Sequence, residues 1–160
     1  MADMTNLGKK AEAKIRAWLD RPEDGYCFDR IPDQQTGFYG STNICDFTLF
    51  RAPSLYYIES KATWGDSFPF SMLTDYQHDE MLKKSKIKGV SSFVIVLFAS
   101  YQRAFILDIQ DIEAQLQSKG RKSINIKKID KWTIPYIEIP TISSKKQLLD
   151  YSKEFADTIF

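Results

Sequence analysis

Glu59 and Lys61 are separated by a single residue in the segment LYYIESKA, and Asp46 lies thirteen residues before Glu59. Two carboxylates can hold Mg²⁺, which binds oxygen ligands at about 2.0–2.1 Å and keeps several waters. Such an ion polarises a phosphate and lowers the pKa of a bound water, while an ammonium group stabilises the developing negative charge. The pattern indicates metal-assisted phosphodiester hydrolysis, with Asp46 and Glu59 as ligands and Lys61 as the ammonium group.

The acid-x-Lys triplet is weak evidence by itself, because Glu12-Ala13-Lys14 matches it equally well. The predicted elements distinguish the two copies. Side chains two residues apart share a face of a strand, whereas in a helix they point about 200° apart. Glu59 and Lys61 therefore converge if their segment is a strand, although an ordinary exposed strand face with a salt bridge fits the same pair.

The elements that must position these residues follow from the apolar spacing in the first half of the chain. Leu7, Ala11, Ile15 and Trp18 predict an opening amphipathic helix behind a cap at Thr5 or Asn6. Strands are predicted at 26–31, 43–50 and 55–62, the last two as a β-hairpin, with a loop from Pro32 to Asn43.

The second half continues with alternating helices and strands. The spacing predicts a helix over 71–88 that ends at Gly89, and the unbroken apolar run 92–99 predicts a central strand buried on both faces. A strand over 103–109, a helix from Asp108 or Asp111 to Lys119, a weak strand over 132–139 and a last helix from Ser143 or Ser144 follow. In that last helix, Leu148, Tyr151, Phe155 and Ile159 would share one face. The order α-β-β-β-α-β-β-α predicts an α/β fold in which helices flank a mixed sheet.

The composition is that of one soluble globular domain spanning residues 1–160, with 43% hydrophobic and 27% charged residues. The longest apolar run, Phe93 to Ala99, is far shorter than the ~20 residues of a membrane span. The N-terminus has no apolar signal segment, so we expect a cytoplasmic protein without membrane contact. Cys27 and Cys45 are accordingly expected to be free, buried thiols.

Charge is distributed unevenly along the chain. Residues 1–80 hold 13 acidic and 8 basic residues, whereas residues 81–131 hold 4 acidic and 11 basic residues. The basic stretch offers candidate phosphate contacts, which supply affinity without sequence information. These are Lys83, Lys84, Lys86, Lys88, Arg121, Lys122, Lys127 and Lys128. Solvated helix and loop faces would explain the same residues without a partner.

The run IESKATWGDSFPF, followed by Gln77, resembles a stretch of the RecU-type Holliday-junction resolvases of the PD-(D/E)xK nuclease superfamily. In that stretch a Phe-Glu-Ala-Lys strand leads through a short loop to Ser-Phe-Pro-Leu and a helix bearing glutamine. The placement of Asp46, the run FVIVLFASYQRAFILD and the segment GRKSI agree with the family in order and spacing. The resemblance extends from Gly37 to Ile137, and it fits a protein of a bacterium or of its virus.

The resemblance implies a restriction-endonuclease-like core and a homodimer that cuts symmetric strands of a four-way DNA junction, in concert with recombination proteins. It implies that Asp46, Glu59 and Gln77 approach Mg²⁺, or Mn²⁺ in its place, and that Lys61 stabilises the transition state. Gln77 also reads as a polar residue on a helix surface. Glu12 reads equally well as an outer carboxylate of the site and as a simple surface acid.

Two departures from the family concern the metal and the junction. Where the family has a hydroxyl residue two positions before the Asp, this chain has Ile44, whose side chain cannot coordinate a cation. The family also inserts a long stalk before that Asp, but here only Pro32 to Asn43 is present. A nuclease of the same fold acting on a flap, a nick or duplex, and a non-catalytic DNA-binding modulator of recombination, therefore remain as alternatives.

Four further side chains lie near the predicted site. Trp64, Phe68 and Phe70 follow the Glu59 strand, and they fit either stacking on an unpaired base or, for at least two of them, core packing. His78, next to Gln77, is the chain's one histidine. We interpret His78 as an incidental helix-surface residue in preference to a general base.

Overall fold

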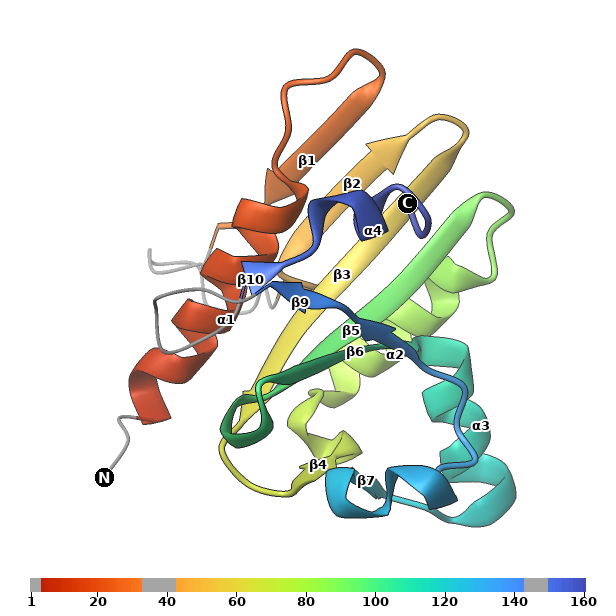
Figure 1. Cartoon of the computed structure of the whole chain (residues 1–160). Coiled ribbons are helices and arrows are strands. Elements are labelled where there is room, and N and C mark those ends of the chain that lie inside the picture. Colours follow the sequence, from red (N-terminus) through yellow and green to blue (C-terminus); the bar gives the residue numbers. More distant parts are fainter. Residues whose placement is uncertain (1–3, 33–42, 143–149) are drawn as a thin grey trace.

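A six-stranded mixed sheet organises the computed structural model, which describes residues 4–32, 43–142 and 150–160 (Figure 1). Its strand order is β1-β2-β3-β5-β6-β8. The β3 and β5 strands pair in parallel, and every other neighbouring pair is antiparallel. The strands are β1 (Tyr26–Arg30), β2 (Phe47–Arg51), β3 (Ser54–Thr63), β5 (Val90–Phe98), β6 (Arg103–Asp108) and β8 (Ile137–Ile139).

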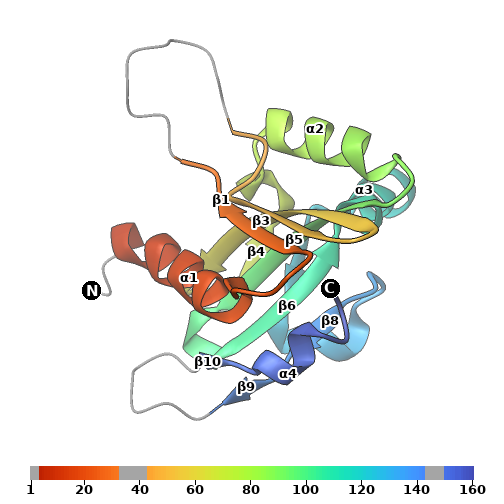
Figure 2. The ribbon, with the colours of Figure 1, turned by 90° about the horizontal axis from the view of Figure 1, so that it is seen from above.

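Helices cover both faces of this sheet, as the sequence predicts. The α1 and α4 helices lie on one face, and α2 and α3 lie on the other (Figure 2). The helices are α1 (Met4–Leu19), α2 (Asp75–Ser85), α3 (Ile109–Lys119) and α4 (Lys153–Ala156), with short 3-10 turns η1 (Phe70–Met72), η2 (Ala99–Tyr101) and η3 (Ile126–Lys131). Two small antiparallel ribbons complete the fold: β4 (Ser67–Pro69) with β7 (Ser123–Asn125), and β9 (Thr141–Ile142) with β10 (Asp150–Tyr151).

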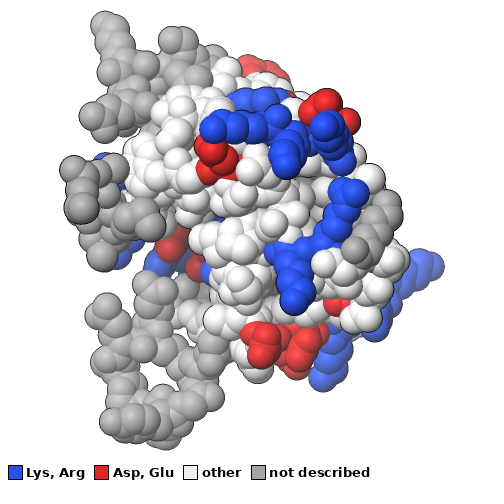
Figure 3. Space-filling view, turned by 90° about the horizontal axis from the view of Figure 1, so that it is seen from below, with Lys and Arg blue, Asp and Glu red and all other residues white. Residues whose placement is uncertain are grey.

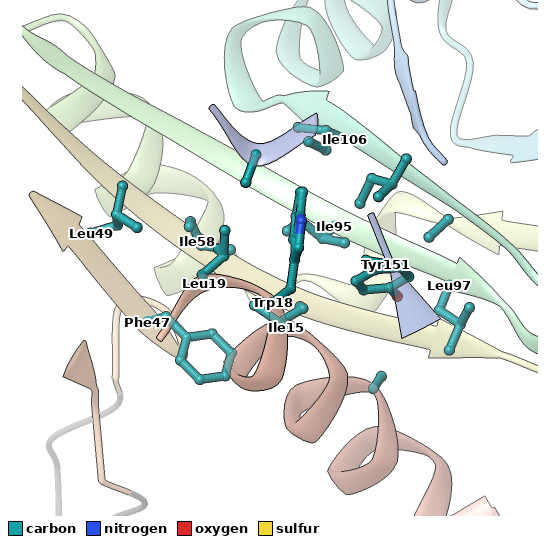
Figure 4. Packing of buried hydrophobic residues seen from close by; sticks show 14 of the residues in the cluster. Ile15, Trp18, Leu19, Phe47, Leu49, Ile58, Ile95, Leu97, Ile106 and Tyr151 are labelled. Atoms are coloured by element: carbon teal, nitrogen blue, oxygen red, sulfur yellow. The ribbon is translucent and has the colours of Figure 1, made fainter. Parts of the chain in front are cut away.

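The core on the α1 face forms because one stripe of α1 is apolar. Ile15, Trp18 and Leu19 are buried against the sheet residues Phe47 and Ile58 (Figure 4). The Trp18 Nε1 group donates a hydrogen bond of 2.7 Å to the carbonyl oxygen of Ser152, so that the indole is both packed and satisfied. This contact fastens the C-terminal segment to the first helix.

A second core fills the space under α2 and α3. Met81 from α2 and Ile112 from α3 are buried with Val94 and Val96 of β5. The intervening residue Ile95 packs in the other core. The β5 strand is therefore apolar on both faces, which explains its unbroken hydrophobic run and confirms its predicted central place.

Several predicted boundaries shift in the structure. The helix expected over 71–88 is confined to α2, because a 3-10 turn precedes it and Thr74 caps its N-terminus. Its predicted stop, Gly89, has φ +84°, which glycine adopts without strain. The strand expected from residue 43 begins at Phe47, and the first helix begins at Met4, so that Thr5 and Asn6 lie inside it. The predicted cap at Asp108 is confirmed, since its side chain accepts from the backbone N–H of Gln110.

The predicted last helix is wrong. Residues 143–149 lie outside the described residues, Tyr151 belongs to β10, and α4 extends only over Lys153–Ala156. Tyr151 pairs with Thr141 across the ribbon, and its ring packs edge-on against Trp18 at 5.5 Å. Tertiary packing on Trp18 thus outweighs the helical spacing of the apolar residues.

Both cysteines are free, as expected, but only Cys45 is buried. Cys27 is exposed because the β1 strand is at the edge of the sheet, where one face of the strand meets solvent. In the part of the chain that the structure describes, no helix has the length and hydropathy needed to cross a membrane.

Candidate active site

The β3 strand presents Glu59 and Lys61 on the face that α2 covers. Ile58, next to Glu59 in the alternation, packs in the core on the α1 side. Glu59 is only 2% exposed, and the Lys61 side chain is 18% exposed. The predicted convergence of these two side chains is confirmed, because Lys61 Nζ lies 2.7 Å from Glu59 Oε1. The other acid-x-Lys copy, Glu12-Ala13-Lys14, lies on α1, where its two side chains diverge.

Asp46 is held beside Glu59 by the backbone of β3. Its N–H donates to the carbonyl oxygen of Ile58 at 3.2 Å, and its carbonyl oxygen accepts from the N–H of Ile31. Its Oδ2 atom accepts from the N–H of Ser60 at 2.8 Å. Asp46 therefore sits at the entry to β2 with its carboxylate fixed next to the residue that follows Glu59.

The two oxygens of Glu59 have different surroundings. The Oε1 atom accepts from Gln77 Nε2 at 2.8 Å and pairs with Lys61. The Oε2 atom is buried and has no hydrogen-bond donor among the described residues. A buried carboxylate oxygen without a partner is costly, so this atom marks a place where a positive group could bind.

Burial dominates the electrostatics of both carboxylates. The pKa of Glu59 is raised to about 7, first by burial and then by the nearby charge of Asp46, although Lys61 and Gln77 act in the opposite direction. Burial also raises the pKa of Asp46, and the charge of Glu12 adds to that effect. Two carboxylates that repel each other in a desolvated place form a donor set suited to a divalent cation.

Gln77 joins the site through the start of α2. It is the third residue of a capping box: the Thr74 hydroxyl accepts from the Gln77 N–H, and Gln77 Oε1 accepts from the Thr74 N–H at 3.2 Å. The same amide turns its Nε2 group toward Glu59. Gln77 is therefore brought to the site as predicted, but in this conformation it presents a donor to Glu59.

Glu12 reaches the margin of the site from α1. Its Oε2 atom lies 2.8 Å from the Arg30 guanidinium at the end of β1, and its charge acts on Asp46. A shallow hollow of about 360 Å³, lined by both residues together with Lys9, Arg16 and Phe47, opens there. Glu12 is thus next to the carboxylate pair and engaged in an ion pair.

The donor set of Asp46 and Glu59 suits a divalent cation that takes only part of its ligands from the protein. Among the described residues, no group of three or more His, Cys, Asp or Glu side chains is arranged to bind a metal ion. Mg²⁺ usually takes one or two carboxylates and completes its shell with water and substrate phosphate oxygens. Asp46 and Glu59, with the unpartnered Oε2 atom, supply such a pair.

The remaining candidates separate into core and surface. Phe68 and Phe70 are buried, which confirms core packing for two of the three aromatic residues. His78 pairs with Asp79 and with Glu113 of α3, away from the carboxylates. Lys83, Lys86 and Lys88 are exposed at the far end of α2, and Lys84 Nζ lies 5.4 Å above the Tyr57 ring.

The basic residues after α3 are on another surface. Arg121, Lys122 and Lys128 are exposed, and Lys127 pairs with Asp66 at 2.7 Å. Figure 3 views the molecule from below and shows Lys and Arg side chains over its upper and central parts, with Asp and Glu side chains beside the upper ones.

Sequence reasoning missed two residues that shape the site. Thr74, which fixes the orientation of Gln77, carries a readable signal, since Thr74-x-x-Gln77 matches the capping-box pattern at a helix start. Arg30, the partner of Glu12, has no comparable signal, because its contact joins a helix to the edge strand β1.

A search of curated proteins finds no match. The Holliday-junction resolvase Hjc of Archaeoglobus fulgidus has a similar structure, with a TM-score of 0.51 and 16% sequence identity over 75% of this chain and 89% of that one. This likeness confirms the predicted restriction-endonuclease-like fold, with its mixed sheet flanked by helices.

A family model described as RecU, recombination protein U, matches residues 32–155. The match includes Asp46, Glu59, Lys61 and Gln77, and it leaves out the α1 helix with Glu12. The chain therefore belongs to the RecU family of Holliday-junction-resolving endonucleases.

Proposed function

We propose that this chain is a Mg²⁺-dependent endonuclease that resolves four-way DNA junctions by phosphodiester hydrolysis, with Mn²⁺ able to replace Mg²⁺. The main support for this proposal is the environment of the Glu59 carboxylate. This carboxylate is buried beside Asp46, has its pKa raised to about 7, and keeps one oxygen without a donor among the described residues. A cation would relieve the repulsion between the two acids and satisfy that oxygen.

Each residue of the site has a distinct task in this proposal. Asp46 and Glu59 would hold a cation, which supplies the polarisation of the scissile phosphate and the activation of water when bound. Lys61 moves its ammonium group from Glu59 toward the phosphate and stabilises the charge that develops there. Gln77 orients Glu59 through its 2.8 Å hydrogen bond. Beyond the effect of burial, the negative charge of Glu12, at the margin of the site, raises the pKa of Asp46.

The exposed cations are proposed to hold the DNA by its phosphates. Lys84 is the best placed of the α2 lysines, because Tyr57 beneath it lies on β3 and shares a face with Glu59 and Lys61. Lys83 lies beside it in the last turn of α2, and Lys86 and Lys88 follow the end of the helix. Arg121 and Lys122 are exposed after α3. Contacts of this kind supply affinity without sequence preference.

Symmetric resolution requires two active sites, so we propose that the functional unit is a homodimer. Only residues 31–46 connect β1 to β2, where the family inserts its stalk. Because the stalk is missing, we keep a second candidate function. That candidate is the same hydrolysis on another branched or nicked DNA.

The test is cleavage of a labelled four-way junction beside flap and linear duplex controls, in Mg²⁺, Mn²⁺ or EDTA. The wild type is compared with Glu59→Ala and, as a matched control, with Glu154→Ala, since Glu154 is an exposed acid on α4. We expect paired symmetric nicks on the junction that require the metal and Glu59 and are insensitive to Glu154→Ala.

The other outcomes separate the alternatives. Equal cutting of all three substrates would replace junction resolution by general nuclease activity. Junction binding without cleavage in either metal would contradict the proposed nuclease activity and would indicate a DNA-binding protein without catalysis. A monomer that persists with DNA at micromolar concentration would contradict paired cleavage.

A further inference from the structure

A small hollow lies on the molecule away from the carboxylate pair, between the end of α3, β7 and η3. Its volume is about 260 Å³, several times the roughly 30 Å³ that one water occupies in the liquid. Its floor is apolar and consists of Ile124, Trp132 and Ile134. Trp132 is held in place there, since its Nε1 group donates to the carbonyl oxygen of Asn125 at 2.8 Å.

Three exposed cations, Arg121, Lys128 and Lys131, line this hollow. No acidic side chain lines it, and none of the three cations forms a salt bridge with a described residue. Elsewhere the described arginines and lysines are often paired, as Arg103 is with Glu138. Three like charges around one concave surface repel one another, and a bound anion would relieve that repulsion.

The hollow is rigidly connected to the catalytic strand. Asp66, just after β3, binds Lys127 of η3 through Oδ2 at 2.7 Å and Tyr101 through Oδ1 at 2.5 Å. Its carbonyl oxygen accepts from the N–H of Ile126. The β4 and β7 strands pair with each other, so that they form a ribbon between the start of α2 and the hollow.

This connection fixes the hollow relative to the active site without making it part of that site. None of its lining residues belongs to the group around Glu59. The β4–β7 ribbon lies between the start of α2, which carries Gln77, and the hollow. The hollow is therefore suited to a segment of backbone that departs from the one being cut, as a second arm of a branched DNA does.

We infer that the hollow lined by Arg121, Lys128 and Lys131 binds a backbone phosphate of a second DNA arm and thereby makes the protein prefer branched DNA over linear duplex. Tyr136 extends the same surface: its exposed ring lies 5.1 Å from Trp132 and offers a platform for a sugar or base. The inference rests on the proposed function, and it supplies a source of branch preference in a chain that has only a short segment in place of the stalk.

The experiment measures binding in EDTA, where no cleavage occurs, of the full chain to a fluorescent four-way junction and to a duplex of the same arm sequence. The test variant is Arg121→Ala/Lys128→Ala/Lys131→Ala. The control, Lys83→Ala/Lys86→Ala/Lys88→Ala, removes the same charge at the far end of α2. A third variant, Arg121→Lys/Lys128→Arg/Lys131→Arg, keeps the three charges. All substituted residues are exposed, and circular dichroism verifies the folds.

We expect the test variant to lose junction affinity by at least about 10-fold, and its duplex affinity to change by less than about 2-fold. The slope of log K against log salt for the junction should become smaller in magnitude by roughly 0.9, the contribution of the one phosphate that the protein no longer neutralises. The control should weaken junction and duplex alike, and the charge-keeping variant should retain the junction preference.

Equal losses on junction and duplex, or no loss on the junction, would overturn the inference. Thermal stabilisation by inorganic phosphate that needs the three cations, with junction affinity intact in the test variant, would assign the hollow to a free anion and also overturn it. A failure of the proposed nuclease activity would appear as junction binding without cleavage in Mg²⁺. The ratio of junction to duplex affinity would still test the role of the hollow in that case.

Discussion

Two carboxylates at either end of one short segment, Glu59 and Asp66, each lie 2.7 Å from a lysine, yet their electrostatics are opposite. Glu59 is buried, one of its oxygens has no donor among the described residues, and its pKa is raised to about 7. Asp66 lies at the surface, both of its oxygens have partners, and hydrogen bonds from Lys127 and Tyr101 lower its pKa.

The distance between an acid and a lysine therefore does not reveal the role of the pair. An exposed carboxylate is stabilised by the lysine beside it. A buried carboxylate also loses its hydration, and one lysine does not offset that cost. Asp66 connects η3 to the end of β3 and has a structural role. Glu59 has an oxygen without a donor among the described residues, which a cation can bind.

Removing the lysines in turn should produce the greatest contrast. Lys61→Met should lower the rate of junction cleavage by roughly 10²–10³-fold, because it removes the ammonium group that stabilises the developing charge. Lys127→Met, which breaks an equally short pair at Asp66, should change the rate by less than about 10-fold. Single-turnover cleavage of a labelled junction measures both rates. Comparable losses in the two variants would contradict the different roles assigned to the Glu59–Lys61 and Asp66–Lys127 pairs.

The raised pKa of Glu59 predicts that Glu59→Gln stabilises the metal-free protein at high pH. Because the folded-state pKa lies above the ordinary value of 4.5, the stability linked to protonated Glu59 is fully present below about pH 4.5 and is lost as the pH rises through 7. Glutamine cannot ionise and avoids this loss. From pH 4.5 to 8 in EDTA, the unfolding free energy of Glu59→Gln should rise relative to wild type by roughly 2–3 kcal/mol.

Urea unfolding at a series of pH values measures this difference. A pH-independent gap between Glu59→Gln and wild type would show that Glu59 is not destabilised by its surroundings. Glu154→Gln is the control, because Glu154 is exposed and its pKa is lowered.

Asp66→Asn should give the smallest effect, with the opposite pH dependence. The pKa of Asp66 is lowered below its ordinary value of 3.8, so its contribution to stability is present above that value and is lost as the pH falls through the folded-state pKa. The variant should be modestly less stable than wild type at neutral pH, and the difference should shrink in acid. Thermal unfolding at pH 7 and near pH 3 distinguishes this from a pH-independent packing defect.

The sequence predicts those parts of the fold that depend on local periodicity. Alternation placed Glu59 and Lys61 on one face of β3, and the unbroken apolar run placed β5 at the centre of the sheet. The chain from β1 to α3 follows the expected order, apart from the small additional strand β4 and short 3-10 turns. In these segments the local pattern and the tertiary packing agree.

The failures occur where distant segments determine the local structure. Tyr151 has helical spacing with Phe155 and Ile159 but lies in a strand, because Trp18, more than 130 residues earlier, packs on it and binds the carbonyl oxygen of Ser152. The Glu12–Arg30 pair and the Asp66–Lys127 pair also join segments that no local spacing connects. The sequence therefore predicts which side chains share the face of β3, but not the pairs that join distant segments.

The amide of Gln77 links helix stability to metal loading. Its nitrogen donates to Glu59, while its oxygen accepts from the Thr74 N–H at the start of α2 and, at 3.5 Å, from Lys61 Nζ. To serve as a metal ligand, Gln77 would have to rotate its amide and release the Thr74 N–H. The first turn of α2 and a bound cation would then compete for a single oxygen, so that filling the site loosens the helix end, and amide exchange at Thr74 would report whether the site is occupied.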